Sequence, residues 1–144
     1  MKFLITLMLL SVFTTPVWLT NFEAAKEIAS KEHKYILLNF SGSDWCAPCV
    51  KMKQEVFEDS TFASLAVPKL ILLRADFPRK KKNLLSAEQI KLNEALAERY
   101  NPNGKFPLTI LLDAQGKVIN QWEGYVFGSQ DKFIQELNAL LNKQ

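Results

Sequence analysis

The two cysteines of the chain, Cys46 and Cys49, lie in the run Trp45-Cys46-Ala47-Pro48-Cys49 and are separated by two residues. Thiols at this spacing can close a small disulfide that is easily reversed. A helix that begins at Cys46 would lower the pKa of its thiol, because the helix dipole and the unpaired backbone N–H groups stabilise a thiolate. Pro48 suits the first turn of such a helix, where no N–H is needed. The motif therefore predicts dithiol–disulfide exchange.

Two other uses of the cysteine pair are a structural disulfide and a metal site. A disulfide between positions three apart closes a loop too small to stabilise the fold much. A metal site would need two more ligands, and the single histidine, His33, lies in a polar stretch before the first predicted strand. We therefore favour a redox pair over an inert or metal-binding one, and we expect neither a metal nor a bound cofactor.

The bulk composition is that of one folded domain. The chain has 144 residues, of which 48% are hydrophobic and 23% charged, so a packed core is expected. The net charge of +3 is too small to indicate nucleic-acid binding. The sequence contains no Gly-rich phosphate loop and no internal repeat. Composition thus leaves the cysteine motif as the main indicator of function.

The N-terminal residues have the pattern of an export signal. Met1-Lys2 is followed by an apolar run over residues 3–13, which is typical of a signal peptide and short for a transmembrane helix. No Ala-x-Ala cleavage site follows, so an uncleaved anchor is the alternative. We expect residues 1–16 to be a signal peptide or N-terminal anchor and residues 17–144 to form the folded domain. The protein is then exported to a periplasmic or other extracytoplasmic space, where conditions are oxidising.

Apolar runs and turn signals predict alternating strands and helices. Nearly continuous apolar runs, which suit strands buried on both faces of a sheet, cover residues 35–40, 70–77 and 106–112. A hairpin turn then returns the chain as a fourth strand over residues 117–122. The expected helices cover residues 20–31, 45–56, 59–66, 86–100 and 129 to about 141. This order predicts an α/β fold with parallel central strands, right-handed crossovers and an antiparallel C-terminal hairpin at the edge.

Capping signals mark the starts of three of these helices. Thr20 with Glu23, and Ser86 with Gln89, have the spacing of a capping box. Ser129 is the expected cap of the last helix. We therefore expect the side chains of these three hydroxyl residues to accept hydrogen bonds from the first helical turns.

The helix that follows Cys46 has one apolar face. Cys49, Met52 and Val56 recur at the spacing of neighbours on a helix surface. This face should pack on the core and carry Cys49 inward. Cys46, at the start of the helix, is then expected at an exposed tip.

From about Trp18 to the C-terminus, the chain resembles the thioredoxin superfamily. Three features carry the resemblance: the Trp-Cys-Ala-Pro-Cys motif after a buried strand, Phe106-Pro107 at the start of a strand that leads into a hairpin, and the order of elements. The resemblance implies a thioredoxin fold, a central mixed sheet flanked by helices. More narrowly, residues 40–46, with Lys51-Met52 and residues 55–57, resemble exported bacterial thioredoxin-like proteins related to the soluble thiol domains of disulfide-interchange reductases.

The resemblance assigns roles to the residues around the motif. Cys46 would be the attacking thiolate, and Cys49 would resolve the mixed disulfide. Trp45 would shield the disulfide and offer the substrate a flat apolar contact, with ordinary packing as the alternative. Pro107 would be cis, and the backbone of Phe106 would pair with the substrate as an added strand. The alternative for Pro107 is an ordinary trans proline at a strand start.

Several residues depart from the superfamily pattern. Asn39 stands where thioredoxin has a buried aspartate that accepts the proton of the second cysteine, and an asparagine cannot take that proton. Arg74 would occupy the place of a buried lysine near the motif, or else be a strand-end charge that reaches solvent. Ala47-Pro48 is close to the Gly-Pro of reducing members. The basic loop Arg79-Lys80-Lys81-Lys82 could steer an acidic partner, and a solvated loop is the favoured interpretation.

The function we expect is that of an exported thiol:disulfide oxidoreductase acting in the reducing or isomerising direction. Its partners would be protein substrates with disulfides or thiols, and a redox protein that supplies electrons. We expect a monomer that binds no nucleic acid. The alternative is a thioredoxin-fold module that docks a peptide or partner through Trp45, Phe106 and Pro107 without turnover.

Overall fold

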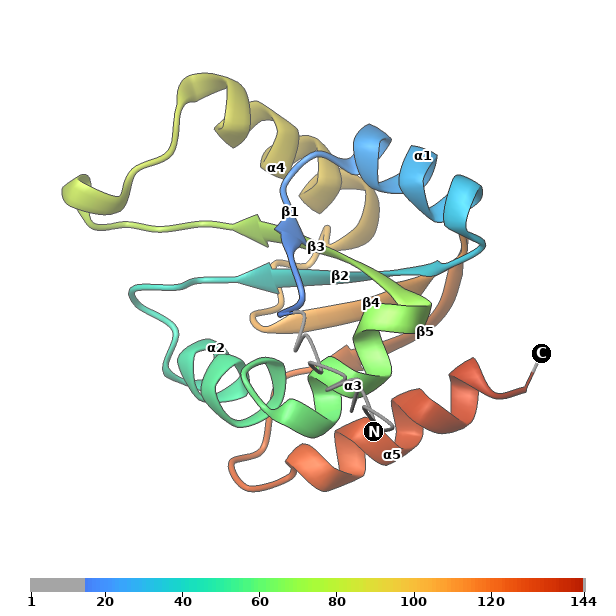
Figure 1. Ribbon diagram of the computed structural model, residues 1–144. Helices are drawn as coiled ribbons and strands as arrows, with labels where there is room; N and C mark the ends of the chain where they lie inside the picture. The colour runs from blue at the N-terminus through green and yellow to red at the C-terminus, as the bar shows by residue number, and fades with distance from the viewer. Residues whose placement is uncertain (1–14, 144) are drawn as a thin grey trace, which may run out of the picture.

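Five strands form one mixed sheet in the computed structural model, which describes residues 15–143 (Figure 1). The strand order across the sheet is β1-β3-β2-β4-β5. The strands are β1 (Trp18–Leu19), β2 (Tyr35–Ser41), β3 (Leu70–Asp76), β4 (Leu108–Leu112) and β5 (Val118–Glu123). β1 and β2 run parallel to β3, whereas β4 runs antiparallel to both β2 and β5. The predicted mixed sheet is confirmed.

The predicted parallel direction of the third long strand is wrong. Leu108, the first residue of β4, pairs with Phe40 near the end of β2, so β4 starts at the edge where β2 finishes. The hydroxyl of Tyr100, the last residue of α4 (Ala87–Tyr100), reaches the carbonyl of Gly116 beyond the far end of β4. Residues 101–107 therefore carry the chain back across the sheet before β4 begins. Alternation of helix and strand does not reveal this extra reversal.

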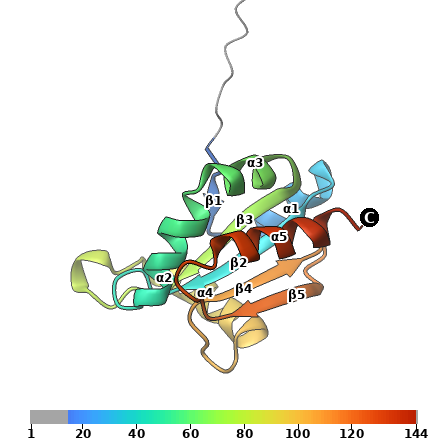
Figure 2. The ribbon, with the colours of Figure 1, turned by 90° about the horizontal axis from the view of Figure 1, so that it is seen from below.

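Helices cover both faces of the sheet (Figures 1 and 2). One layer holds α1 (Phe22–Glu32) and α4, and the other holds α2 (Ala47–Met52), α3 (Ser60–Lys69) and α5 (Gln130–Leu141). α2 continues directly into the π-helical turn η1 (Lys53–Phe57). A short 3-10 turn, η2 (Lys81–Asn83), lies in the long loop between β3 and α4. This three-layer arrangement is the predicted thioredoxin fold.

The core divides into two apolar clusters, one on each face of the sheet. Leu37 of β2 packs with Met52 and Val56 toward α2, whereas Ile36 and Leu38 pack toward α1 and α4. The side chains of Ile36, Leu37 and Leu38 are all fully buried. β2 is thus buried on both faces, as its continuous apolar run predicts. The predicted core residues of α5 are also buried: Phe133, Leu137 and Leu141.

The helix caps differ from the predicted ones at two positions. α1 is capped by Asn21, whose side chain accepts the N–H of Ala24 at 3.0 Å, so Thr20 is not the cap. Ser86 does cap α4 by accepting the N–H of Gln89. The hydroxyl of Ser129 donates to the carbonyl of Val126 and makes no capping bond. The Ser129 hydroxyl thus bonds to a backbone carbonyl of the preceding loop instead of to an N–H group of the first helical turn.

The predicted N-terminal signal or anchor over residues 1–16 lies almost wholly outside the described residues. Among the helices of residues 15–143, none combines the length and the apolar character that crossing a membrane requires.

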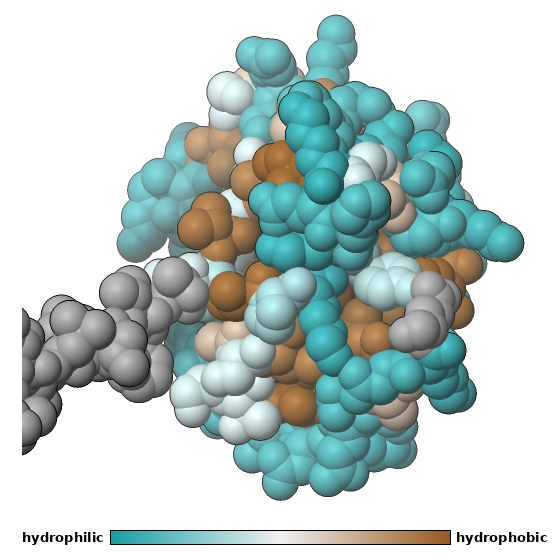
Figure 3. All heavy atoms as spheres, turned by 45° about the vertical axis from the view of Figure 1, so that its right-hand side comes forward, coloured by the Kyte–Doolittle hydropathy of each residue, from teal (hydrophilic) through white to brown (hydrophobic). Residues whose placement is uncertain are grey.

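Hydrophobic side chains on the face shown in Figure 3 are interrupted by hydrophilic ones.

Candidate active site

The two cysteines lie where β2 gives way to α2. Cys46 has an extended backbone (φ −99°, ψ 99°) and occupies the N-cap position of α2, with Pro48 in the first turn. Cys46 and Cys49 are joined by a disulfide, and their Cα atoms are 5.2 Å apart. The sequence predicts a helix start at this cysteine, and the structure confirms it. The first turn of the helix therefore carries the whole redox pair.

Backbone N–H groups point at both sulfur atoms. The N–H of Cys49 donates to Sγ of Cys46 at 3.3 Å. The N–H of Gly42, in the loop before the motif, donates to Sγ of Cys49 at 3.5 Å. In the reduced protein the Cys46 sulfur would be a thiolate, and the same donor would stabilise its charge. The local geometry is thus that of an activated cysteine.

Cys46 is not at an exposed tip, which corrects the sequence prediction. Its side chain is 5% exposed, against 3% for Cys49. It lies in a shallow groove of about 590 Å³, which we call the α2 groove, and Cys49 does not line this groove. Residues from two loops, Lys80 and Phe127, contribute to its walls. Of the two cysteines, Cys46 is the one that lines the groove.

Trp45 is held by packing on several sides. Its Nε1 donates to the carbonyl of Phe77 at 2.7 Å, and its ring meets Phe106 edge to face at 5.3 Å between centroids. The guanidinium of Arg79 lies 3.8 Å from the ring centroid. A Cβ atom at Gly42 would overlap the ring, so this position needs glycine. The alternative packing role is therefore present, and a contact with substrate remains a proposal.

The Phe106–Pro107 peptide bond is cis, as the resemblance implies. Pro107 is buried, and its carbonyl accepts the N–H of Gly124 at 2.8 Å. Phe106 is half-buried and contacts both Trp45 and Phe77. Phe106 therefore lies beside the cysteine motif, although Phe106 and Trp45 are about 60 positions apart in the chain.

Asn39 lies beneath the helix that carries the cysteines. Its side chain is 2% exposed, and Nδ2 donates to Oγ1 of Thr109 at 3.1 Å. The Thr109 hydroxyl in turn approaches Sδ of Met52 at 3.7 Å, and Met52 is three positions after Cys49 on α2. The sequence prediction did not include Thr109, because its partner on β2 is 70 positions away. The group that contacts α2 at Met52, one helical turn from Cys49, is thus a neutral amide–hydroxyl pair.

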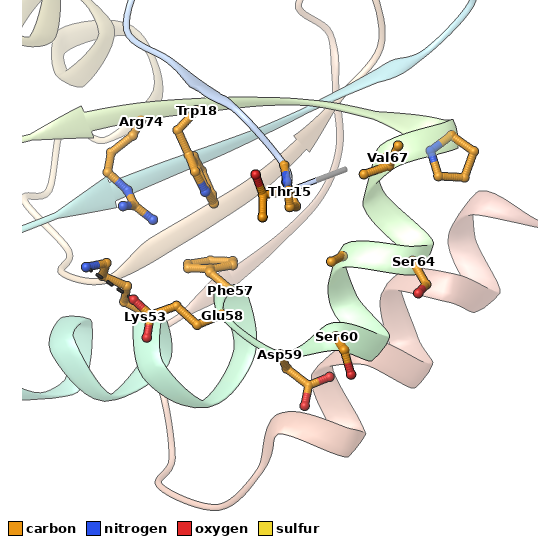
Figure 4. Close-up of a pocket in the computed structure, with 13 residues that line it drawn as sticks. Thr15, Trp18, Lys53, Phe57, Glu58, Asp59, Ser60, Ser64, Val67 and Arg74 are labelled. Atoms are coloured by element: carbon orange, nitrogen blue, oxygen red, sulfur yellow. Dashed lines mark ion pairs between the residues drawn. The ribbon is translucent and has the colours of Figure 1, made fainter. Parts of the chain in front are cut away.

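Arg74 pairs in register with Asn39 on the neighbouring strand, but its side chain is directed elsewhere. Its guanidinium lies 4.0 Å from the ring centroid of Trp18 and 5.6 Å from that of Phe57 (Figure 4). Nε is buried without a partner, and burial lowers the pKa of Arg74, an effect partly offset by Asp76 and Glu58. The pocket it lines, about 780 Å³, includes neither cysteine. The structure therefore does not bring Arg74 to the redox pair.

Two acidic residues that the sequence prediction did not include fix the loops that follow β2 and β3. Asp76 accepts the N–H of Ser43 at 2.9 Å and its hydroxyl at 2.5 Å. Asp44 accepts the N–H of Arg79 at 2.9 Å, and it also binds Lys80 and Asn83. These bonds, that from Arg79 first, hold the pKa of Asp44 below its ordinary value. The sequence signal for this contact was an aspartate, Asp44, directly before the cysteine motif, together with a basic segment over residues 79–82 that could bind it.

Glu55 fixes a third loop against α2. It accepts the hydroxyl of Tyr125 at 2.5 Å and the N–H of Gly128 at 2.9 Å, and Nζ of Lys51 is 3.6 Å away. The Tyr125 hydroxyl, and then the Gly128 N–H, lower the pKa of Glu55. Burial and the bond to Glu55 raise the pKa of Tyr125. The loop between β5 and α5 is therefore anchored beside the cysteines.

Histidine, cysteine and carboxylate side chains do not gather into a possible metal site anywhere in residues 15–143. His33 ends α1 with a left-handed backbone and is exposed.

Comparison with known proteins places the chain in a family. The family model that describes the thioredoxin-like domain matches residues 22–141. Disulfide bond reductase DsbH of Chlamydia pneumoniae is 32% identical over 121 residues, 84% of this chain and 70% of that protein. Thioredoxin-related protein DsbJ of the same organism is 27% identical over 103 residues, which are 72% of this chain and 29% of DsbJ.

Solved structures agree with this assignment. The structure of a DsbH oxidoreductase superposes with a TM-score of 0.77 at 29% identity, covering 91% of this chain and 88% of that one. A poplar thioredoxin h, at 18% identity and a TM-score of 0.64, shares the fold and covers 91% of this chain and 100% of its own. The chain belongs to the thioredoxin-like domain family and, with its Cys46–Cys49 disulfide, is a thiol:disulfide oxidoreductase.

Proposed function

We propose that the protein is an exported disulfide reductase. The thiolate of reduced Cys46 attacks one sulfur of a substrate disulfide, and the other substrate sulfur leaves as a thiolate that takes a proton from solvent. Cys49 then attacks the mixed disulfide, releases the second substrate thiol and closes the Cys46–Cys49 disulfide. Two electrons have passed from the protein to the substrate. A partner protein must return them by the same exchange in reverse.

The observation that carries the proposal is the N–H of Cys49 directed at the Cys46 sulfur at 3.3 Å. It gives Cys46 a donor at the helix start, where a thiolate is favoured. Its position in the α2 groove makes it the sulfur that substrate meets first. We assign attack to Cys46 and resolution to Cys49 on these grounds.

The reducing direction is supported by two further features. Ala47-Pro48 between the cysteines offers no side chain that would stabilise the thiolate further, as histidine does in strong oxidants. DsbH, 32% identical to this chain, is named a disulfide bond reductase. We extend this direction to the present protein, with Trp45, Phe106 and Pro107 as the surface that contacts substrate. Export rests on the apolar run over residues 3–13.

The test is the reduction of insulin by dithiothreitol with and without the protein. We expect the wild type to accelerate insulin precipitation, Cys46→Ser to have no effect, and Cys49→Ser to accumulate a mixed disulfide through Cys46. Equal acceleration by wild type and Cys46→Ser would overturn the proposal. A protein that binds insulin without accelerating its reduction would instead favour the docking module without turnover.

A further inference from the structure

The α2 groove is bounded by two loops, each anchored by a carboxylate. Asp44 holds residues 79–83 through three hydrogen bonds, and Glu55 holds residues 125–128 through two. In Figure 2 the loops before α4 and before α5 both lie on the side of the molecule where α2 begins. A basic loop that only extended into solvent would need no such anchor. The walls of the groove are therefore built parts of the site around Cys46.

The two walls differ in chemistry. Lys80 lines one wall and makes no ion pair with the described residues. Phe127 lines the other wall and is 56% exposed, and Val126 beside it is 74% exposed. Lys51 projects from α2 between the walls, with Nζ 6.0 Å from the centroid of Phe127. The groove thus offers the ammonium of Lys80 and an unfilled apolar surface, whereas the Lys51 ammonium is paired with Glu55.

The acidic groups near the groove offset part of this positive charge. The Asp44 carboxylate is the acidic group that lines the groove, and it is occupied by N–H donors from the basic loop itself. Glu55 forms an ion pair with Lys51 through one oxygen, 3.6 Å from Nζ, and its other oxygen accepts from Tyr125 and Gly128. The Lys80 ammonium therefore forms no ion pair with a carboxylate of the described residues, although the charge of Asp44 attracts it. A partner chain could supply one next to Cys46.

We propose that the preferred exchange partners of this protein are polypeptides with an acidic residue and an apolar residue beside the reacting cysteine. The carboxylate would pair with Lys80, and the apolar side chain would be buried against Phe127. This inference rests on the proposed exchange function and adds its substrate class. The charge acts mainly on the rate of encounter, so the preference weakens as salt screens it.

The experiment compares three synthetic peptides of one length, each with a single intramolecular disulfide and an acidic, neutral or basic flank. Single-turnover oxidation of the reduced protein is followed by tryptophan fluorescence at two ionic strengths. We expect the acidic peptide to react about fivefold or more faster than the basic peptide at low salt, and the ratio to fall toward one at high salt. An acidic peptide with leucine beside the cysteine should react faster than its glycine counterpart.

Variants assign the preference to the groove. Lys80→Glu should invert the acidic-to-basic rate ratio, and Lys80→Gln should give an intermediate ratio. Lys91→Glu makes the same change in net charge on the exposed surface of α4 and should leave the ratio as in wild type. Phe127→Ser should remove the advantage of the leucine peptide over the glycine peptide.

The outcomes separate this inference from the function on which it rests. If wild type reduces the neutral peptide but all three peptides react at one rate, the substrate class is wrong and the reductase stands. The substrate class is also wrong if Lys91→Glu changes the ratio as much as Lys80→Glu, because net charge alone then explains the preference. If none of the peptides is reduced, the proposed function itself fails.

Discussion

The backbone N–H of Cys49 lies 3.3 Å from the sulfur of Cys46 and donates a hydrogen bond to it. The donor belongs to the first turn of α2, whose N–H groups have no partners within the helix. A negative charge on Cys46 is therefore stabilised by the fold itself. The first prediction follows from this contact.

In the Cys49→Ser variant, which keeps this N–H, we expect the Cys46 thiol to titrate with a pKa between about 3.5 and 7.5. The measurement is the rate of alkylation by iodoacetamide as a function of pH. A midpoint at about 8.5, the value of a free cysteine, would show that the helix start does not activate this sulfur.

The buried pair of Asn39 and Thr109 gives the second prediction. Asn39→Asp would place a carboxyl group under α2, where it could accept the proton of Cys49. Burial raises the pKa of such a carboxyl, so we expect the release of a trapped Cys46 mixed disulfide to be faster near neutral pH. Single-turnover release is measured across pH, with Asn39→Ala as the control that lacks a proton acceptor. Identical profiles for wild type and Asn39→Asp would show that position 39 does not serve Cys49.

The same variant should lose stability in a defined pH window. A carboxyl with a raised folded-state pKa binds more protons in the folded state than in the unfolded state. Its cost is therefore absent below the unfolded value of about 3.9, and it grows as the pH rises to the folded value. Each unit of the raised pKa corresponds to about 1.4 kcal/mol at higher pH. Urea unfolding of Asn39→Asp and wild type at pH 4 and pH 8 measures this difference.

Gly42 and Trp45 give the third prediction. Because a Cβ at position 42 would overlap the Trp45 ring, Gly42→Ala should displace the ring and lengthen its bond to Phe77. We expect the free energy of unfolding to fall by about 1–3 kcal/mol, as in overpacked cores. In a Trp45→Ala background the same change should have almost no effect. Equal losses in both backgrounds would place the strain in the backbone instead.

Glu55 and Tyr125 give the fourth prediction. A carboxyl with a lowered folded-state pKa stabilises the fold above the ordinary value of about 4.3, and this contribution is lost as the pH falls through the folded value. Tyr125→Phe removes the largest cause of the lowering. The variant should be less stable than wild type at pH 7, and the gap should narrow below about pH 4.

Tyr100→Phe is the matched control for this pH dependence. Its hydroxyl donates to the carbonyl of Gly116, which does not titrate. The stability gap for Tyr100→Phe should therefore stay constant between pH 3 and 7, as measured by urea unfolding. A constant gap for Tyr125→Phe as well would mean that the Glu55 bond contributes nothing that depends on charge.

Local signals in the sequence were enough to predict those parts of the fold that depend on residues close together in the chain. The continuous apolar run of β2 and the proline after Cys46 locate the strand–helix junction that carries the redox pair. The antiparallel direction of β4 could not be predicted, because residues 101–107 decide it and have no strand or helix pattern. The two-residue strand β1 is also too short to leave a pattern.

The surroundings of the cysteines were less predictable for a related reason. The partners of Asp44 are 35 to 39 positions away, and the partners of Glu55 on the β5–α5 loop are 70 to 73 positions away. Such contacts exist only after the sheet has assembled. The sequence favours a solvated basic loop, and its residues 79–82 are exposed in the structure, but the sequence does not indicate that Lys80 also lines the α2 groove.

The central claim is that the Cys46–Cys49 pair works in the reducing direction. Redox titration of the purified protein against glutathione, followed by thiol alkylation, tests it most directly. We predict a midpoint potential of roughly −200 to −270 mV, near that of thioredoxin and the glutaredoxins. A midpoint near about −120 mV, the range of a strong oxidant, would contradict this direction and assign the protein to disulfide formation.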